Sequence, residues 1–219
     1  MTWDDDGLYR RCVAVKAKNY VLQKYKEDLK PGEKEMIIKG SAFKSANKEP
    51  ALKEMMQEFV NCLINDKNDI FFLNIFKRYI IEAMNIQDIS RWAVKKTVTD
   101  KVLNGDRTQE VKVMNAIGLD VVQEGDKIYV YNAIVGEVQA VAKGEPVVYK
   151  NGLPKMIPNR ILVQTKDFNV SNYDRMHYVE RVYDTVSILQ TVLKIELFPK
   201  YHLKNANLLL TDLCKNYTI

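Results

Sequence analysis

Hydrophobic and polar side chains alternate along residues 10–22, a pattern with a period of two that is typical of a half-buried β-strand. The alternation places Val13, Val15 and Ala17 on one face, and Lys16, Lys18 and Tyr20 on the other. The polar stretch 24–34 contains Pro31-Gly32 and has the composition of a turn, after which residues 36–38 form an apolar run that ends at Lys39-Gly40. We therefore expect a β-hairpin with a cationic face in this part of the chain.

Apolar residues then recur at helical spacing in two successive segments. The first helix is expected to begin at Pro50, with apolar side chains at Leu52, Met55, Met56, Phe59, Val60, Leu63 and Ile64. The second is expected over about 69–84, with Phe72, Ile75, Phe76, Tyr79 and Ile80 on one stripe. The short link 65–68 favours a helical hairpin, and we interpret the aromatic residues of the stripe as core rather than as a surface that stacks on bases.

The second half of the chain is predicted to mix extended segments with helices. Residues 90–101 form a polar, basic, extended segment, and Thr108 is placed as the N-cap of a short helix that stops at Gly118. Strand-like segments at 128–131, 133–141, 146–149 and 160–163 are separated by Gly and Pro, which predicts a small β insertion. A long helix over 173–197, ended by Pro199, and a short one over 205–213 complete an α+β fold.

Composition excludes several classes of protein. With 219 residues, 47% of them hydrophobic, the chain can bury a core and is not a disordered tail. Three cysteines at irregular spacing favour neither zinc nor disulfides and fit a reducing compartment. The most apolar run, 70–81, contains Asn74, Lys77 and Arg78, and the N-terminus lacks a signal peptide, so we expect a soluble, cytoplasmic protein.

The charge is mildly positive and unevenly distributed, with a net value of +5. Residues 1–53 hold twelve Lys or Arg against eight Asp or Glu, and residues 91–112 hold six against three, so two basic regions stand out. Motifs for phosphate loops, dinucleotide binding, zinc proteases and nucleophile elbows are absent from the sequence. His177 and His202 lie in unrelated segments, and the acidic run 4–6 is interpreted as a terminus, so no catalytic or metal-binding residue is predicted.

The N-terminal residues carry a more specific pattern. A strand ending Lys18-Asn19-Tyr20, a return strand ending Lys39-Gly40, a polar loop and a long helix together resemble the C-terminal palm and thumb of family B DNA polymerases. That family has a Lys-x-Tyr motif, in which x is any residue, and a Lys-Gly pair. Both meet the duplex near the primer terminus. The loop 41–50 is similar to the variant found in bacteriophage polymerases, which leaves the roles of Lys44 and Lys48 open.

The resemblance continues along the chain in the family's order. Residues 92–100 resemble an extended thumb segment, residues 107–113 and 124–131 a helix and a Gly-Asp strand, and residues 173–193 the long thumb helix. The resemblance implies a palm hairpin over 1–49 and a thumb domain over 50–219. It also implies DNA contacts from Lys16, Lys18, Tyr20, Lys39, Gly40, Lys44, Lys95, Lys96, Arg107 and Thr108.

The family's catalytic aspartate segments do not occur in this sequence. The resemblance therefore implies a split or excised, bacteriophage-like chain that grips primer–template duplex for DNA replication and is inactive alone. A larger partner chain would carry the exonuclease and the catalytic palm with its magnesium. Two alternatives stay open, namely a stand-alone duplex DNA-binding accessory protein, whose lysines bind DNA without a polymerase, and a helical scaffold, whose lysines are merely solvated.

Overall fold

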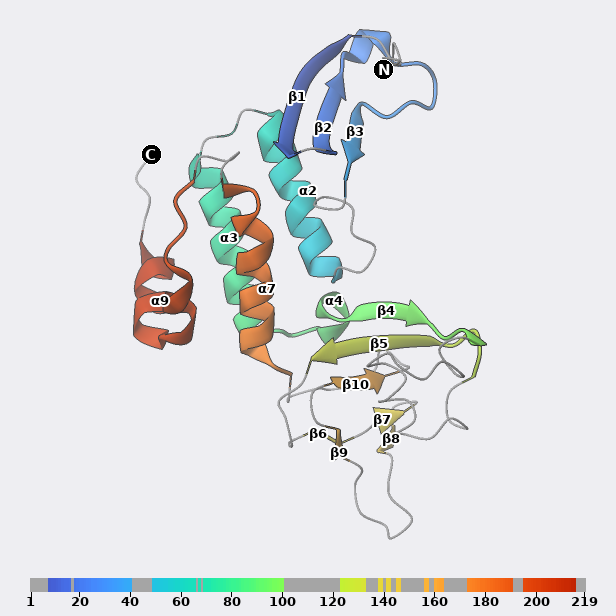
Figure 1. Ribbon diagram of the computed structural model, residues 1–219, viewed down its shortest axis with the longest axis vertical. Coiled ribbons are helices and arrows are strands. Elements are labelled where there is room, and N and C mark those ends of the chain that lie inside the picture. Colours follow the sequence, from blue (N-terminus) through green and yellow to red (C-terminus); the bar gives the residue numbers. More distant parts are fainter. Residues whose placement is uncertain are drawn as a thin grey trace. The chain divides into compact units, whose positions relative to one another are not determined.

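The computed structural model describes residues 8–16, 18–40, 49–65, 67, 69–100, 123–132, 138–139, 141–142, 145–146, 156–157, 160–163, 173–190 and 195–215. Helices and small antiparallel sheets occur together in these residues, which confirms the predicted α+β class (Figure 1). The chain divides into a first unit of residues 1–48, 52–82 and 180–219 and a second unit of residues 49–51 and 83–179. This division into two compact units does not test the assignment of the chain to a palm hairpin and a thumb, so the domain boundary at residue 49 stays a prediction.

The first unit contains a three-stranded antiparallel sheet of β1 (Tyr9–Lys16), β2 (Asn19–Lys24) and β3 (Met36–Lys39), in the order β1-β2-β3. The single strand predicted over 10–22 is wrong, because Lys16 pairs with Asn19 and the chain reverses between them. Lys18 adopts a left-handed backbone with φ of 64°, which the reversal requires. The predicted return strand is confirmed, and a 3₁₀ turn at Lys26–Asp28 lies in the connection.

One face of this sheet is tied to helix α2 (Pro50–Ile64). Arg11 pairs with Gln23 across β1 and β2, and its guanidinium donates to the carbonyl oxygens of Leu63 and Ile64 at 3.0 and 2.5 Å. The last carbonyls of a helix have no partner within it, so a cation there both completes hydrogen bonds and complements the helix dipole. No sequence pattern predicts this contact.

The two helices predicted after residue 50 are confirmed as α2 and α3 (Asp69–Met84). Phe72, Phe76 and Tyr79 are buried, as expected of a core stripe, and Phe72 stacks on Phe59 with ring centroids 5.9 Å apart. The Tyr79 hydroxyl donates to Glu58 at 2.8 Å. Burial raises the pKa of Tyr79, so the hydroxyl stays a donor.

The helix predicted over 173–197 is too long. Helix α7 spans Arg175–Ser187. The amide of Leu189 bonds to the carbonyl of Val186 at 2.8 Å, a short-range bond typical of a tightening last turn, and residues 195–199 are not helical. The apolar periodicity continues past the helix because Ile195 and Leu197 are buried in the segment that follows.

The C-terminal part of the first unit consists of the 3₁₀ helix η3 (Lys200–Lys204) and helix α9 (Ala206–Cys214). Asn205 caps α9 by accepting from the amide of Leu208 at 3.2 Å, which confirms the helix predicted there. Asp212 is buried, and its two carboxylate oxygens lie 2.6 Å from His202 Nδ1 and from Lys215 Nζ. This cluster fastens α9 to η3.

The second unit contains a three-stranded antiparallel sheet in the order β10-β5-β4, formed by β10 (Arg160–Val163), β5 (Lys127–Asn132) and β4 (Val94–Thr97). Short strands pair separately, β6 (Val138–Gln139) with β9 (Met156–Ile157) and β7 (Val141–Ala142) with β8 (Glu145–Pro146). Strands therefore occur in the region of the predicted β insertion.

The extended segment predicted over 90–101 is wrong at its start, because helix α4 (Ile89–Trp92) occupies it. The side chain of Asp88 accepts from the amide of Ser90 at 2.9 Å and begins this helix. Trp92 is buried edge-to-face against Tyr178, whose hydroxyl accepts from the amide of Asn132. The helix predicted from Thr108 lies outside the described residues, among which no helix is long and apolar enough to cross a membrane.

Candidate nucleic-acid interface

Four of the residues predicted to meet DNA come together at one end of the β1-β2-β3 sheet. Tyr20 and Lys39 are cross-strand partners in β2 and β3, which places their Cβ atoms roughly 5 Å apart. Lys18 lies in the turn before β2, and Gly40 directly follows β3. We call Lys18, Tyr20, Lys39 and Gly40 the sheet-end cluster. The pairing of β2 with β3 unites residues that are far apart in the sequence.

Gly40 holds the end of β3 against the turn that contains Lys18. Its φ is 98°, and a Cβ atom at this position would lie 2.3 Å from Asn19 Oδ1 and 2.4 Å from the carbonyl oxygen of Lys18. Both distances are far below van der Waals contact, so only glycine fits. The close approach that the resemblance assigns to DNA is made here by the chain's own turn, and Gly40 is a positioning residue for Lys39.

Tyr20 and Lys39 of the sheet-end cluster lie on the face of the sheet opposite α2. Asn19, Val21 and Gln23 are buried, whereas the alternating side chains of β2, which include Tyr20, are half-buried. Since Gln23 shares its face with Arg11, which bonds to α2, Tyr20 lies on the opposite face. Lys18 and Lys39 are exposed. The expected association of Lys18 with Tyr20 is kept, but through a turn and not through one continuous strand.

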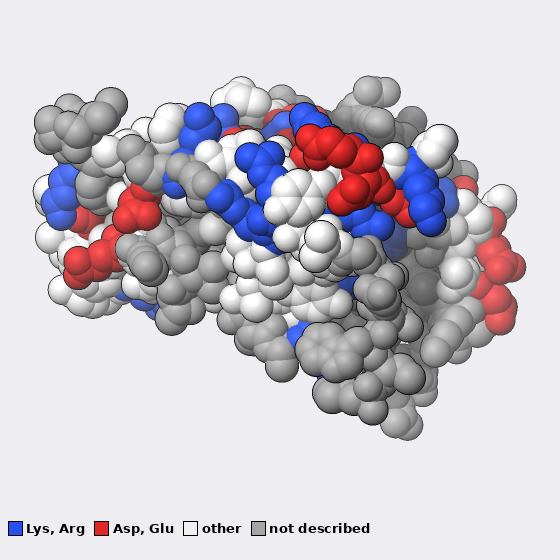
Figure 2. All heavy atoms as spheres, turned by 90° about the horizontal axis from the view of Figure 1, so that it is seen from above, with Lys and Arg blue, Asp and Glu red and all other residues white. Residues whose placement is uncertain are grey.

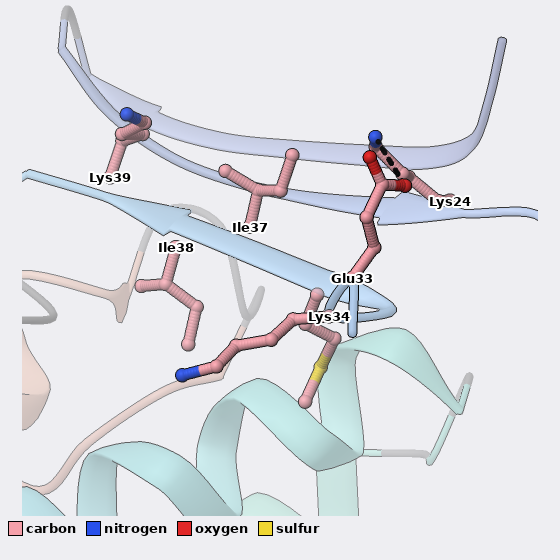
Figure 3. Close-up of a pocket in the computed structure, with 7 residues that line it drawn as sticks. Lys24, Glu33, Lys34, Ile37, Ile38 and Lys39 are labelled. Atoms are coloured by element: carbon pink, nitrogen blue, oxygen red, sulfur yellow. Dashed lines mark hydrogen bonds and ion pairs between the residues drawn. The ribbon is translucent and has the colours of Figure 1, made fainter. Parts of the chain in front are cut away.

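A pocket of about 310 Å³ adjoins this cluster and is lined by Lys24, Glu33, Lys34, Met36, Ile37, Ile38 and Lys39. Figure 3 shows Lys39 and Ile37 on one side of β3 and Ile38 on the other, with the side chain of Lys34 extending past Ile38. Lys24 is paired with Glu33 at 3.2 Å, and the hydrogen bond from Lys24 lowers the pKa of Glu33.

The positive charge near the sheet-end cluster is confined to a few lysines. Among the described residues, Lys18, Lys34 and Lys39 form no ion pair with a carboxylate. Figure 2 shows Lys and Arg side chains in a band that is interrupted by a group of Asp and Glu side chains. Figure 3 places the Lys34 side chain on the same side of β3 as Ile38 and therefore opposite Lys39, so Lys34 does not belong to the sheet-end cluster.

The second basic region places Lys95 and Lys96 on opposite faces of β4. Lys95 is exposed and pairs with Tyr129 in β5, and its Nζ lies 5.7 Å from the centre of the Tyr129 ring. Lys96 pairs with Ile128 and is half-buried. Consecutive strand residues point to opposite faces, so the two lysines do not share a face of the sheet, and their contact with a duplex stays a prediction.

Several predicted contacts are not described. Lys44, Arg107 and Thr108 lie outside the described residues, and for Lys16 only the backbone at the end of β1 is described. Among the residues with described positions, no group of three or more His, Cys, Asp or Glu side chains could hold a metal ion. Comparison of the chain with protein-family models and with curated proteins found no match.

Proposed function

We propose that this chain is the palm and thumb part of a family B DNA-directed DNA polymerase, and that it grips primer–template duplex for a partner chain that carries the catalytic aspartates. The observation that supports this function most directly is the sheet-end cluster. Lys18, Tyr20 and Lys39 come from a turn and two strands, Gly40 holds the end of β3 against that turn, and Tyr20 and Lys39 lie on the sheet face opposite α2.

The chemistry of the cluster suits a grip that ignores sequence. A polymerase must move over every base pair, so its contacts with the product duplex have to be made with phosphates or with groove atoms that all pairs share. Lys18 and Lys39 are exposed and present ammonium groups to phosphates, and the half-buried Tyr20 adds an aromatic ring and a hydroxyl beside Lys39. No base-specific bidentate group is needed for this role.

The sheet also supports a partner chain over a stand-alone DNA-binding protein. Within the described residues, β1 and β3 each pair with one neighbour only, namely β2. Strand edges expose unpaired amides and carbonyls, and proteins that work alone usually block or cover them. We infer that the partner, carrying exonuclease, catalytic palm and magnesium, lies beside this sheet, in the bacterial cytoplasm if the chain is phage-encoded.

The test measures the affinity of the chain for two unrelated duplexes across monovalent salt concentrations by fluorescence anisotropy. Phosphate contacts from Lys18 and Lys39 predict that the logarithm of the association constant falls with the logarithm of the salt concentration with a slope of about −1.8 or steeper, the same for both sequences, since each phosphate neutralised contributes about 0.9. A response that does not change with salt, or a strong preference for one duplex, would contradict the proposal.

In this assay Lys18→Asn removes the positive charge of residue 18 while keeping its backbone conformation. Asparagine tolerates the left-handed φ of residue 18, so the turn should persist while one cation is lost. The salt slope should then become shallower by about 0.9. Lys26→Gln, on the exposed 3₁₀ turn of the same unit, is the matched control and should leave the slope at its wild-type value.

A further inference from the structure

The pairing of β4 with β5 places four side chains of interest on one face of the second unit's sheet. Lys95 pairs with Tyr129 and Thr97 pairs with Lys127, and residues two apart on a strand share a face. We call Lys95, Thr97, Lys127 and Tyr129 the β4–β5 face. The sequence does not single out Lys127 as a binding residue, because the register that brings it beside Lys95 joins segments about thirty residues apart.

Each of the two lysines of this face contacts another side chain of the face. Lys127 Nζ donates a hydrogen bond to Thr97 Oγ1, and the ammonium group of Lys95 lies over the ring of Tyr129. Lys95 and Lys127 are diagonal neighbours across the strand pair, a relation that sets residues roughly 7–8 Å apart. Side chains that are already positioned lose less entropy when a ligand binds.

The nearby carboxylates are engaged elsewhere. Asp126 accepts from the amide of Gln123 at 2.9 Å, and Glu124 accepts from the amide of Asp100 at 3.2 Å. Within the described part of the chain, neither Lys95 nor Lys127 forms an ion pair with a carboxylate. Both lysines are exposed and can therefore bind an external anion without first breaking an ion pair with a described carboxylate.

We propose that the β4–β5 face binds the phosphodiester backbone of the duplex, with Lys127 and Lys95 contacting neighbouring phosphates and the Thr97 hydroxyl donating to the same strand. This inference rests on the proposed function, since it gives the duplex a second contact surface on the chain. The face presents donors, and its aromatic ring is buried with only 5% exposed, so it suits backbone oxygens and not stacking on bases.

Lys96 provides a control built into the same strand. It is the neighbour of Lys95 in sequence and has the same charge, but it lies on the opposite face and pairs with Ile128. A purely long-range attraction between a basic segment and DNA would treat Lys95, Lys96 and Lys127 alike. Direct contact with phosphates would separate Lys96 from the other two.

The experiment repeats the salt titration on the full chain with Lys127→Gln, Lys127→Arg and Lys96→Gln, using a short duplex labelled at one end as the probe. Lys127→Gln should make the log–log slope shallower by about 0.9. Lys127→Arg, which keeps the charge, and Lys96→Gln, on the other face, should both keep the wild-type slope. Thermal melting followed by circular dichroism checks that each variant is folded, as expected for a substitution at the exposed Lys127.

The outcomes distinguish this inference from the proposed function. If Lys127→Gln keeps the wild-type slope while Lys18→Asn loses about 0.9, the β4–β5 face does not bind phosphate and the sheet-end cluster still does. Equal losses for Lys127→Gln and Lys96→Gln would also overturn the inference, because they would indicate attraction without a defined face. A wild-type chain without salt-dependent binding would refute the proposed function itself.

Discussion

Replacing Gly40 with alanine tests the packing that forms the sheet-end cluster. Two costs add at this position. A positive φ costs an ordinary L-residue about 1–2 kcal/mol, and here φ is 98°. The new methyl group would also lie 2.4 Å from the carbonyl oxygen of Lys18, a backbone atom that cannot rotate away, and overpacking of this kind costs about 1–3 kcal/mol.

Gly40→Ala should therefore lower the free energy of unfolding by about 2–5 kcal/mol. Urea unfolding followed by circular dichroism gives the total effect, and hydrogen exchange of the β2 and β3 amides shows whether the sheet opens locally before the rest of the unit. Because Lys39 is the residue before Gly40, the shift should also weaken binding to duplex DNA.

Gly32→Ala is the matched control. Its φ is 86°, so it carries a similar backbone cost, but nothing lies within 4 Å of the position a Cβ would take. The difference between the two variants isolates the steric contact with Lys18 and Asn19. If Gly40→Ala costs no more than Gly32→Ala, the close approach of β3 to the turn is wrong, and Gly40 is then available for the approach to DNA that the family resemblance implies.

Three further predictions follow from other contacts. Arg11→Ala should lower the free energy of unfolding by about 1.5–3 kcal/mol in urea because it removes two hydrogen bonds to the end of α2, whereas the exposed Arg10→Ala should change it by no more than about 0.5 kcal/mol. Burial would raise the pKa of Asp212, but hydrogen bonds from Lys215 and His202 lower it overall. The ionised Asp212 therefore stabilises the fold fully at pH values above the pKa of the carboxyl in the unfolded chain, and this stabilisation is lost as the pH falls through the pKa of the carboxyl in the folded chain. Asp212→Asn should therefore flatten the loss of stability between neutral pH and about pH 3, measured by urea unfolding at each pH, and an unchanged curve would contradict this. Pure chain given primed template, deoxynucleotides and magnesium should incorporate no nucleotide, and detectable extension would contradict the assignment of catalysis to a partner.

Helices α2 and α3 could be predicted because their signals are local. Pro50 marks the start of α2, and the apolar stripe of α3 has its period within a single segment, so both were placed correctly. The reversal at Lys18 could not, since a lysine in a left-handed turn carries none of the Gly, Asn or Pro signals that mark turns. Alternation of side chains continued across the turn and made two strands look like one.

The same limit applies to function, because a binding surface depends on which residues share a face. Period-two alternation already implies that Lys95 and Lys96 diverge once the segment is known to be a strand, but it cannot reveal that Lys127 joins Lys95, because register is set by distant pairing. Counting six basic residues in the window 91–112 therefore overstates how many phosphates the segment can contact at once. The salt dependence of binding reports the number of cations on the contacting face, so it tests the fold and the proposed function in a single measurement.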